Sequence, residues 1–161
     1  MKTKKFIPIM IVLIVSLVSC NTNKSVVKTE SKNVENSDSQ KTDKKLVEKY
    51  WKLDEIGNEK IEMSANSSQE PHIIFKSENN RIAGNSGCNN IMSSYKIGEN
   101  GEITILDAAS TMKMCMEQDM NIERRFLQLL KNTKSYSIKN DILILYDTEK
   151  KQLAKFSAVY M

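Results

Sequence analysis

Short stretches in which apolar and polar residues alternate recur from residue 50 onward, and turn residues separate them. Alternation over four to eight residues is typical of β-strands that bury one face. Turn signals lie between the stretches, for example Gly57-Asn58 and the sequence Gly98-Glu99-Asn100-Gly101. The pattern predicts strands within residues 50–56, 71–77, 81–86, 91–97, 102–106, 136–138, 142–146 and 154–160.

One helical period interrupts this strand pattern between residues 117 and 132. Its apolar residues recur three and four positions apart, so they share one face, and charged residues occupy the other face. Such a helix must cover an apolar surface. We therefore predict an α+β fold, an antiparallel sheet curled as a half or open barrel around this one amphipathic helix. The apolar positions are Ile122, Phe126, Leu129 and Leu130.

Three residues give further expectations about the folded part. Trp51 is the only tryptophan of the chain and is expected to anchor the core. Gly84 and Gly87 are both assigned to the strand that begins at residue 81. Glycine in a strand indicates a bulge or a close approach of two backbones.

The N-terminus has the features of a bacterial secretion signal. Residues 1–5 are basic, and residues 6–18 form an apolar run of about 13 residues, which is too short to cross ~30 Å of hydrocarbon comfortably. The sequence Leu17-Val18-Ser19-Cys20 resembles a lipobox, which implies cleavage before Cys20 and acyl chains on that cysteine. We therefore predict a lipoprotein signal peptide at residues 1–19.

Residues 20–45 follow as a predicted tether, rich in polar and charged residues. Such a segment cannot bury enough apolar surface to offset its chain entropy, so we expect it to be disordered. As a flexible coil it would reach on the order of 30 Å. Asn21 after the lipidated residue favours the outer membrane, facing the periplasm. The folded domain is then predicted at residues 46–161.

Charge argues against nucleic acid as a partner. The formal net charge of the chain is +4, from 24 basic and 20 acidic residues. Removal of the signal peptide would take away Lys2, Lys4 and Lys5, leaving 21 basic residues against 20 acidic ones. Phosphate contacts require a clustered excess of lysine and arginine, which this composition lacks.

The segment from Gly84 to Asn90, G-N-S-G-C-N-N, followed by Tyr95, resembles the G-x-x-G-C-N…Y signature of the META domain family, the HslJ-like heat-shock lipoproteins. Further matches follow in order: Trp51-x-Leu53, Ser110-Thr111-Met112-x-Met114-Cys115, Glu123-x-x-Phe126-Leu127-x-x-Leu130 and Leu143-x-Leu145. The resemblance covers about residues 50–156. It implies a half barrel with a helix, similar to pilotin lipoproteins, and a role in stress tolerance, antibiotic resistance, motility or virulence.

Cys88 and Cys115 remain as a pair once Cys20 carries lipid. In an oxidising compartment such a pair can form a disulfide. It would close a loop of roughly 26 residues and destabilise the unfolded chain by about 3–4 kcal/mol. Two separate buried thiols and a redox-active role are the alternatives. There is no C-x-x-C motif, and nothing in the sequence places a base beside either cysteine.

A methionine-rich segment is the sharpest candidate for binding chemistry. Met112, Met114, Cys115 and Met116 lie close together, with Met120 one turn further on. Thioether and thiolate ligands at short spacing suit Cu(I), and a copper-bound form would exclude the disulfide. The family resemblance instead accounts for Met112, Met114 and Cys115 as packing residues, since methionine commonly fills cores.

The remaining polar candidates have simpler interpretations. His72 is the sole histidine and is predicted on the outer face of its strand, so a zinc site or a catalytic triad would lack its usual parts. Glu123 lies near the start of the helix, which favours a role in helix-dipole stabilisation over that of a buried acid. A third group could line a pocket but is better explained by turn capping: Asn85, Ser86, Asn89 and Asn90.

We therefore predict a non-enzymatic envelope lipoprotein without a cofactor, a tethered binding or accessory module linked to stress tolerance. Its partners would be the membrane, through the lipid on Cys20, and a protein of the envelope. One alternative is a carrier of an apolar ligand such as an acyl chain, with Trp51, Phe75, Phe126 and Phe156 lining the cavity. The other alternative is the Cu(I) site.

Overall fold

A computed structural model describes residues 43–65, 67 and 69–160 of the chain. The predicted signal peptide, Cys20 and residues 21–42 of the predicted tether lie outside the described residues. All described residues belong to one compact unit. No helix in this part of the chain has the length and hydropathy that crossing a membrane requires.

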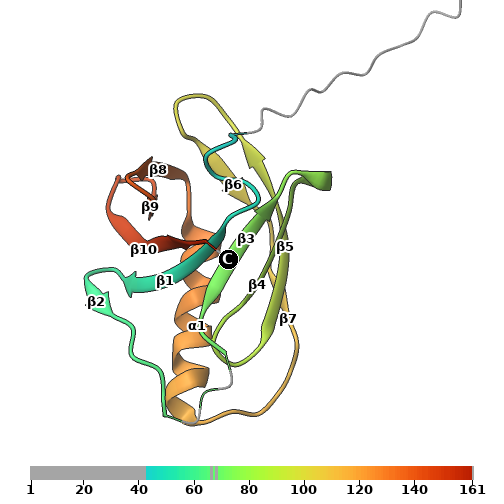
Figure 1. Ribbon diagram of the computed structural model, residues 1–161, viewed down its shortest axis with the longest axis vertical. Helices are drawn as coiled ribbons and strands as arrows, with labels where there is room; N and C mark the ends of the chain where they lie inside the picture. The colour runs from blue at the N-terminus through green and yellow to red at the C-terminus, as the bar shows by residue number, and fades with distance from the viewer. Residues whose placement is uncertain (1–42, 66, 68, 161) are drawn as a thin grey trace, which may run out of the picture. The chain divides into compact units, whose positions relative to one another are not determined.

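The described residues form a ten-stranded antiparallel sheet and one α-helix, which confirms the predicted α+β fold (Figure 1). The short strands β2 and β7 were not predicted. The sheet order is β6-β5-β4-β3-β1-β10-β9-β8, with β2 paired to β1 and β7 paired to β5. The first strands are β1 (Tyr50–Ile56), β2 (Glu59–Lys60), β3 (His72–Lys76), β4 (Arg81–Asn85), β5 (Asn90–Ile97), β6 (Ile103–Ile105) and β7 (Ala109–Ser110). The helix α1 (Glu117–Asn132) and the strands β8 (Ser135–Lys139), β9 (Ile142–Tyr146) and β10 (Gln152–Val159) follow. A short 3-10 helix, η1 (Glu78–Asn80), connects β3 to β4.

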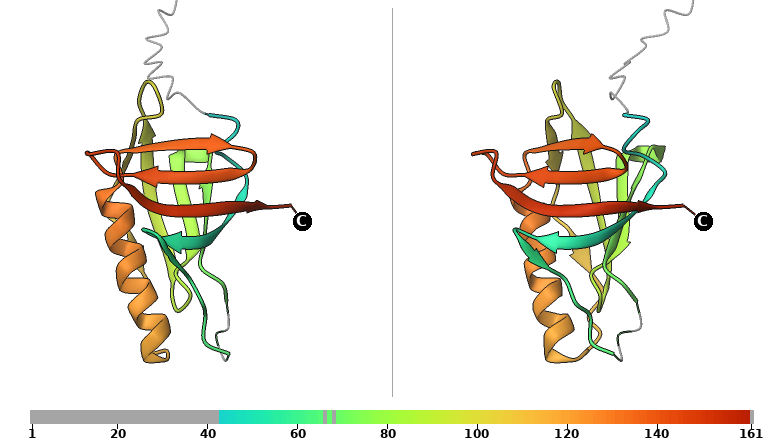
Figure 2. Two further views of the ribbon diagram at one scale, coloured as in Figure 1. Left: turned by 90° about the vertical axis from the view of Figure 1, so that its left-hand side faces the viewer. Right: turned by 60° about the vertical axis from the view of Figure 1, so that its left-hand side comes forward.

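The sheet curls into a barrel that is nearly closed and keeps one open seam. The path of paired strands ends at β6 on one side and at β8 on the other. Two backbone hydrogen bonds bridge these ends, from the Ile103 N–H to the Lys134 carbonyl (3.0 Å) and from the Tyr136 N–H to the Gly101 carbonyl (2.9 Å). The C-terminal strands, orange to red in Figure 2, cross the green and yellow strands β3, β4 and β5 steeply, and α1 runs alongside.

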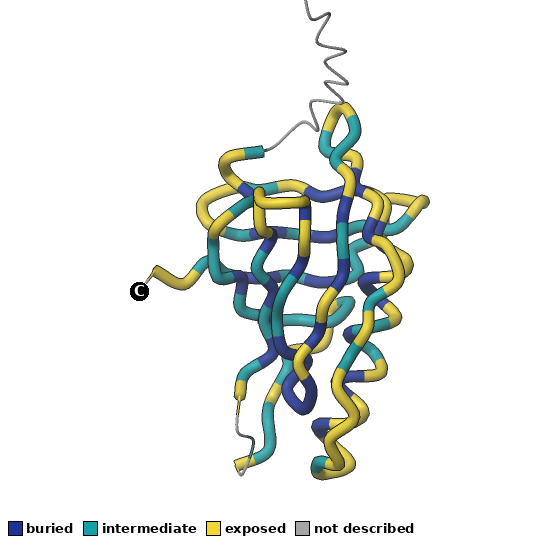
Figure 3. The backbone as a smooth tube through the Cα atoms, turned by 90° about the vertical axis from the view of Figure 1, so that its right-hand side faces the viewer, coloured by how far each residue is buried: buried dark blue, intermediate teal, exposed yellow. Residues whose placement is uncertain are grey.

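The core fills the space inside this curled sheet. Alternate residues of each strand point inward, which gives the alternating dark and light pattern along the strands in Figure 3. Trp51 is completely buried, as expected of a core anchor. The helix contributes Ile122, Phe126, Leu129 and Leu130 as predicted, and the Phe126 ring meets Phe156 edge-on with centroids 6.1 Å apart.

The residues before β1 cover one end of the barrel. The Leu46 side chain is completely buried, and its carbonyl accepts a hydrogen bond from the Trp51 indole N–H at 2.8 Å. The Tyr136 hydroxyl donates to the Asp43 carboxylate at 2.8 Å. A turn here contains Asp43, Lys44 and Lys45. These three residues were predicted to belong to the tether.

Two glycines in the central stretch have different roles. Gly84 pairs with Ile73 in the β3–β4 ladder, and a Cβ atom at Gly84 would collide with the backbone carbonyl of His72. The close backbone approach predicted at this position is therefore confirmed. Gly87 lies after the end of β4, in a turn with φ of +100°, a conformation that favours glycine. Its assignment to the strand was wrong, because the chain already reverses direction there.

We expect Gly84→Ala to lower the free energy of unfolding by about 3 kcal/mol, because the new methyl group meets rigid backbone and must push β3 and β4 apart. Gly98→Ala is the matched control. A methyl group at Gly98 would meet side chain rather than backbone: Glu102 Oε2 at 2.9 Å can rotate away, and Glu102 Cβ at 3.0 Å requires a small shift, so the loss should be about 1 kcal/mol. Urea unfolding of both variants measures this, and equal losses would contradict it.

Candidate functional site

The two sequence segments that carry the family resemblance meet at a disulfide. Cys88 in the turn after β4 is bonded to Cys115, two residues before α1, with the Cα atoms 5.9 Å apart. The structure thus shows the first of the three alternatives left open for these cysteines. The bond joins the β4–β5 hairpin to the start of the helix. We call residues 111–116, which connect β7 to α1, the methionine loop.

The buried side chain of Asn89 holds the methionine loop on the side that faces the domain. Its side chain is 4% exposed, and its amide oxygen accepts hydrogen bonds from the Lys113 N–H and the Thr111 hydroxyl, both at 2.7 Å. Its amide nitrogen donates to the Lys113 carbonyl at 3.2 Å. One buried side chain therefore pairs with both backbone groups of Lys113, as a neighbouring strand would, and fixes the loop in place.

Glu123 completes this network from the helix. Its carboxylate accepts the second amide hydrogen of Asn89 at 2.8 Å, and the residue is 9% exposed. The expectation that Glu123 chiefly stabilises the helix dipole was wrong, because its side chain is buried beneath the methionine loop. A signal was present in the sequence: Glu123 lies three residues before Phe126, on the flank of the apolar face of α1.

The methionine loop alternates between inward and outward residues. Thr111 and Cys115 turn toward the domain, through a hydrogen bond and the disulfide respectively. Met112 and Met114 point away from it and are 98% and 94% exposed. Met116, the residue before α1, is 54% exposed. The interpretation of Met112 and Met114 as packing residues was therefore wrong, because a motif does not reveal on which side of the chain its residues lie.

The contrast between the loop and its support is visible along the backbone. In Figure 3 the turn between β4 and β5 is dark blue, since every residue from Asn85 to Asn89 is buried, whereas the chain leading into α1 is largely yellow. A hairpin turn ordinarily lies in solvent. The turn between β4 and β5 is buried instead. Its polar groups and the disulfide hold the methionine loop so that the side chains of Met112 and Met114 lie in water.

The other polar residues of the hairpin cap its turn, as predicted. The same prediction was wrong for Asn89, because its side chain bonds to the methionine loop and to Glu123. The Asn85 amide oxygen accepts the Gly87 N–H at 2.7 Å, and its amide nitrogen donates to the Asn90 amide oxygen at 2.9 Å. The Ser86 hydroxyl donates to the Asn89 carbonyl at 3.0 Å. These groups satisfy one another, so they form a turn rather than the lining of a pocket.

His72 lies in a different cluster, on the outer face of β1 and β3. Its ring stacks on Tyr50 with centroids 4.2 Å apart, and its Nδ1 is 3.0 Å from the Glu70 carbonyl oxygen. A hydrogen bond from Lys52, 2.8 Å away, lowers the pKa of the Glu70 carboxyl. Burial, followed by the effect of Glu70, raises the pKa of Tyr50 to about 12. The tyrosine therefore stays protonated at neutral pH and offers no activated nucleophile.

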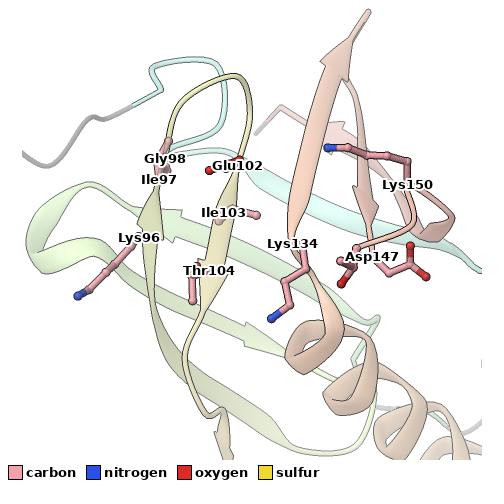
Figure 4. A pocket seen from close by; sticks show the side chains of 10 residues that line it. Lys96, Ile97, Gly98, Glu102, Ile103, Thr104, Lys134, Asp147 and Lys150 are labelled. Carbon is pink, nitrogen blue, oxygen red and sulfur yellow. The ribbon is translucent and has the colours of Figure 1, made fainter.

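A hollow of about 530 Å³ lies beside the open seam, between the β5–β6 hairpin on one side and Lys134 with the β9–β10 turn on the other (Figure 4). Lys96, Lys134 and Lys150 line it, together with Glu102 and Asp147. The three lysine ammonium groups point to separate places in Figure 4 and do not converge. One of them, on Lys150, donates to the Ser135 hydroxyl at 3.0 Å. This arrangement of mixed charges is typical of a solvated surface rather than of a binding site.

The structure also places the residues of the two alternative hypotheses, the acyl-chain carrier and the Cu(I) site. Trp51, Phe75, Phe126 and Phe156 are completely buried and pack within the core, where Phe75 also meets Tyr95 edge-on at 5.2 Å. The Cu(I) hypothesis loses its thiolate, because Cys115 is bonded to Cys88. Among the residues that the structure describes, no group of three His, Cys, Asp or Glu side chains could hold a metal ion.

Comparison with known proteins identifies the fold and leaves the activity open. The family profile described as "META domain" matches residues 44–160. A search of curated proteins finds no match. An NMR structure titled "NMR structure of the protein" is 22% identical, with a TM-score of 0.57, covering 73% of this chain and 94% of that one.

Two further solved structures have the same fold. One, an NMR structure from Burkholderia xenovorans, is 18% identical with a TM-score of 0.60, covering 72% of this chain and 85% of that one. The other is a crystal structure of a DUF4847 family protein from Bacteroides vulgatus. It is 14% identical with a TM-score of 0.50, covering 70% of this chain and 93% of that one. At these identities the likeness concerns the fold alone.

Reduction of the Cys88–Cys115 disulfide should lower the free energy of unfolding by about 3.5 kcal/mol, because a separation of 27 residues no longer restrains the unfolded chain. Cys20→Ser protein contains only these two cysteines. Denatured without reductant it should give no reaction with Ellman's reagent, and after reduction two thiols per chain. A thiol titrated before reduction would show that the bond is incomplete.

Proposed function

This chain belongs to the META domain family, and from that premise we propose that it is a non-enzymatic, lipid-anchored envelope protein whose folded domain binds a partner protein through the methionine loop. The observation that carries this proposal is the exposure of Met112 and Met114 on a segment that a disulfide and Asn89 hold in place. In keeping with the family resemblance, we link the module to stress tolerance.

The proposed anchor is the lipid on Cys20. It is supported by the basic residues 1–5, the apolar run at 6–18 and the lipobox-like sequence that ends in Cys20. Two or more acyl chains hold a protein on a membrane far more firmly than one does. The tether would then bring the folded domain into the periplasm from the outer membrane.

The proposed contact lies away from the anchor. The chain enters the described domain at Asp43, at the opposite end from the start of α1, which the methionine loop precedes (Figures 1 and 2). A partner can therefore reach the loop without meeting the point at which the predicted tether joins the domain. This placement favours a protein partner over the membrane that carries the anchor.

The methionines suit a contact of this kind. Methionine is flexible and polarizable, adapts to irregular apolar surfaces and is enriched at protein interfaces. Burying one such side chain contributes about 1.5–3 kcal/mol, so the pair supplies part of the free energy of a complex, and contacts around the loop would have to supply the rest. Because the backbone of the loop is already fixed, binding orders few additional groups, which preserves most of this gain.

The alternative functions have less support. A carrier of acyl chains would need Trp51 and the three phenylalanines to line a cavity, yet these side chains pack against one another and against the rest of the core. A Cu(I) site in the disulfide form would retain only neutral thioethers, with the positive charge of Lys113 between Met112 and Met114. For catalysis, the hydroxyls of Ser64 and Ser67 donate to the Asp119 carboxylate at 2.9 and 2.7 Å, but the sole histidine lies elsewhere, stacked on Tyr50, so a triad would be incomplete.

Cys20→Ser should release the protein from the membrane, because the acceptor of the acyl chains is removed. Fractionation of cells that produce the natural and the substituted chain measures this, and wild-type protein should be in the detergent-soluble membrane fraction. The conservative change Ser19→Ala, which leaves the thiol in place, is the control. Membrane retention of Cys20→Ser protein would overturn the proposed lipid anchor.

A photo-crosslinking amino acid at position 112 or 114 should capture a discrete envelope protein in living cells, because these side chains would be buried in the complex. Position 92 is the matched control, since Met92 is also an exposed methionine, at 54%, but lies on β5 outside the methionine loop. The bands at 112 and 114 should disappear when the chain carries Met112→Ser or Met114→Ser at the other position. Equal capture from position 92 would mean that the loop is not the contact.

A further inference from the structure

The sulfur atoms of the described domain differ widely in their access to solvent. Met112 and Met114 are almost fully exposed, whereas Met92 and Met116 are 54% and Met120 is 38% exposed. Met63 is partly buried and packs against Gly87. The two cysteines are joined in a disulfide, so no thiol is available at Cys88 or Cys115. The first reducing sulfurs that a soluble oxidant meets on this domain are therefore the thioethers of the methionine loop.

We propose that Met112 and Met114 form a site of reversible oxidation by two-electron oxidants such as hydrogen peroxide or hypochlorous acid, and that their sulfoxides end partner binding without unfolding the domain. The second half of this statement rests on the proposed function. The site of oxidation and the tolerance of the fold to it do not depend on the proposed function.

The reaction needs nothing beyond the oxidant. A lone pair of the thioether sulfur attacks one oxygen of hydrogen peroxide, so that an S–O bond forms and the O–O bond breaks. The sulfur is oxidised by two electrons, and the leaving hydroxide takes the proton from the oxygen now bound to sulfur, which gives the sulfoxide and water. Susceptibility follows exposure. A methionine sulfoxide reductase restores the thioether with two thiols as the reductant, which become a disulfide while the sulfoxide oxygen leaves as water.

The domain should tolerate these sulfoxides because neither methionine helps to hold the loop. The loop is fixed by the disulfide and by Asn89, whose amide donates to the Lys113 carbonyl and accepts a hydrogen bond from the Thr111 hydroxyl. Oxidation at positions 112 and 114 removes no packing, and the new oxygen atoms lie in water. Oxidation of Met63 would instead place a polar oxygen against Gly87 and Pro71, whose side chain also lies beside this glycine.

The bound state should not tolerate them. The contact proposed for Met112 and Met114 is apolar, and a sulfoxide oxygen enclosed there without a hydrogen-bond donor is strongly unfavourable. The backbone N–H of Lys113, the residue between the two methionines, is not free to donate to the sulfoxide oxygen atoms, because it already donates to Asn89. The same segment would therefore bind in its reduced state and release when oxidised, while the support beneath it stays unchanged.

Graded oxidation of the purified full chain by hydrogen peroxide tests the site. Cleavage after Lys113 separates Met112 from Met114, and fragmentation of the second peptide distinguishes Met114 from Met116 and Met120. We expect Met112 and Met114 to oxidise at least about fivefold faster than Met63, with a melting temperature unchanged within about 2 °C at that stage. Oxidation of Met63 at the same rate, or a clear fall in melting temperature, would overturn the proposal.

Leucine at both positions separates oxidation from docking, because Met112→Leu/Met114→Leu keeps the apolar volume and removes the sulfur. With a photo-crosslinker at Lys113, wild-type protein should lose its crosslink on mild oxidation and recover it after treatment with methionine sulfoxide reductase, whereas the leucine variant should keep it throughout. Loss in both proteins would place the sensitive sulfur elsewhere and overturn the release step. If no crosslink forms before oxidation, the proposed function and the release step that rests on it are both wrong. The order in which the methionines oxidise and the melting temperature still test the proposed oxidation site.

Discussion

The amide group of Asn89 is the constraint on which the functional end of this domain depends. It connects the β4–β5 hairpin, the backbone of Lys113 and the carboxylate of Glu123 on α1. An amide is suited to this position because it offers two donors and an oxygen that accepts twice, and all of them are used. Replacing it by an apolar side chain would leave the Glu123 carboxylate buried without its donor, which is more unfavourable than the loss of the bond itself.

The disulfide restrains the same region by different means, because it joins the hairpin to the methionine loop directly. It limits how far the hairpin and the start of α1 can separate, whereas the hydrogen bonds of Asn89 set the orientation of the loop between them. The helix in turn covers the inside of the sheet with Phe126 and its neighbours. The loop is thus held by a structure that the hydrophobic core already stabilises. Two backbone hydrogen bonds bridge the β6–β8 seam of the barrel, and Leu46 covers one of its ends.

Much of the fold could be predicted because local patterns decide it. The period of α1 gives its bounds without reference to the rest of the chain, and strand alternation gives the order of the elements. The positions that could not be predicted depend on contacts between distant segments. Glu123 is buried because Asn89, 34 residues earlier, lies above it. Met112 and Met114 are exposed because the inward side of their segment is occupied by the partners of Asn89, which no count of apolar residues reveals.

In the methionine loop, residues that hold the loop in place alternate with residues that are exposed for binding. Thr111, the backbone of Lys113 and Cys115 hold the loop, and the side chains of Met112 and Met114 touch nothing that the fold requires. A change of side chain at the outward positions would alter what the loop can contact without altering how the loop is held. An extended strand has this property because successive side chains point to opposite sides. A scaffold of this kind can therefore change its binding chemistry at two positions while keeping the buried network that presents them.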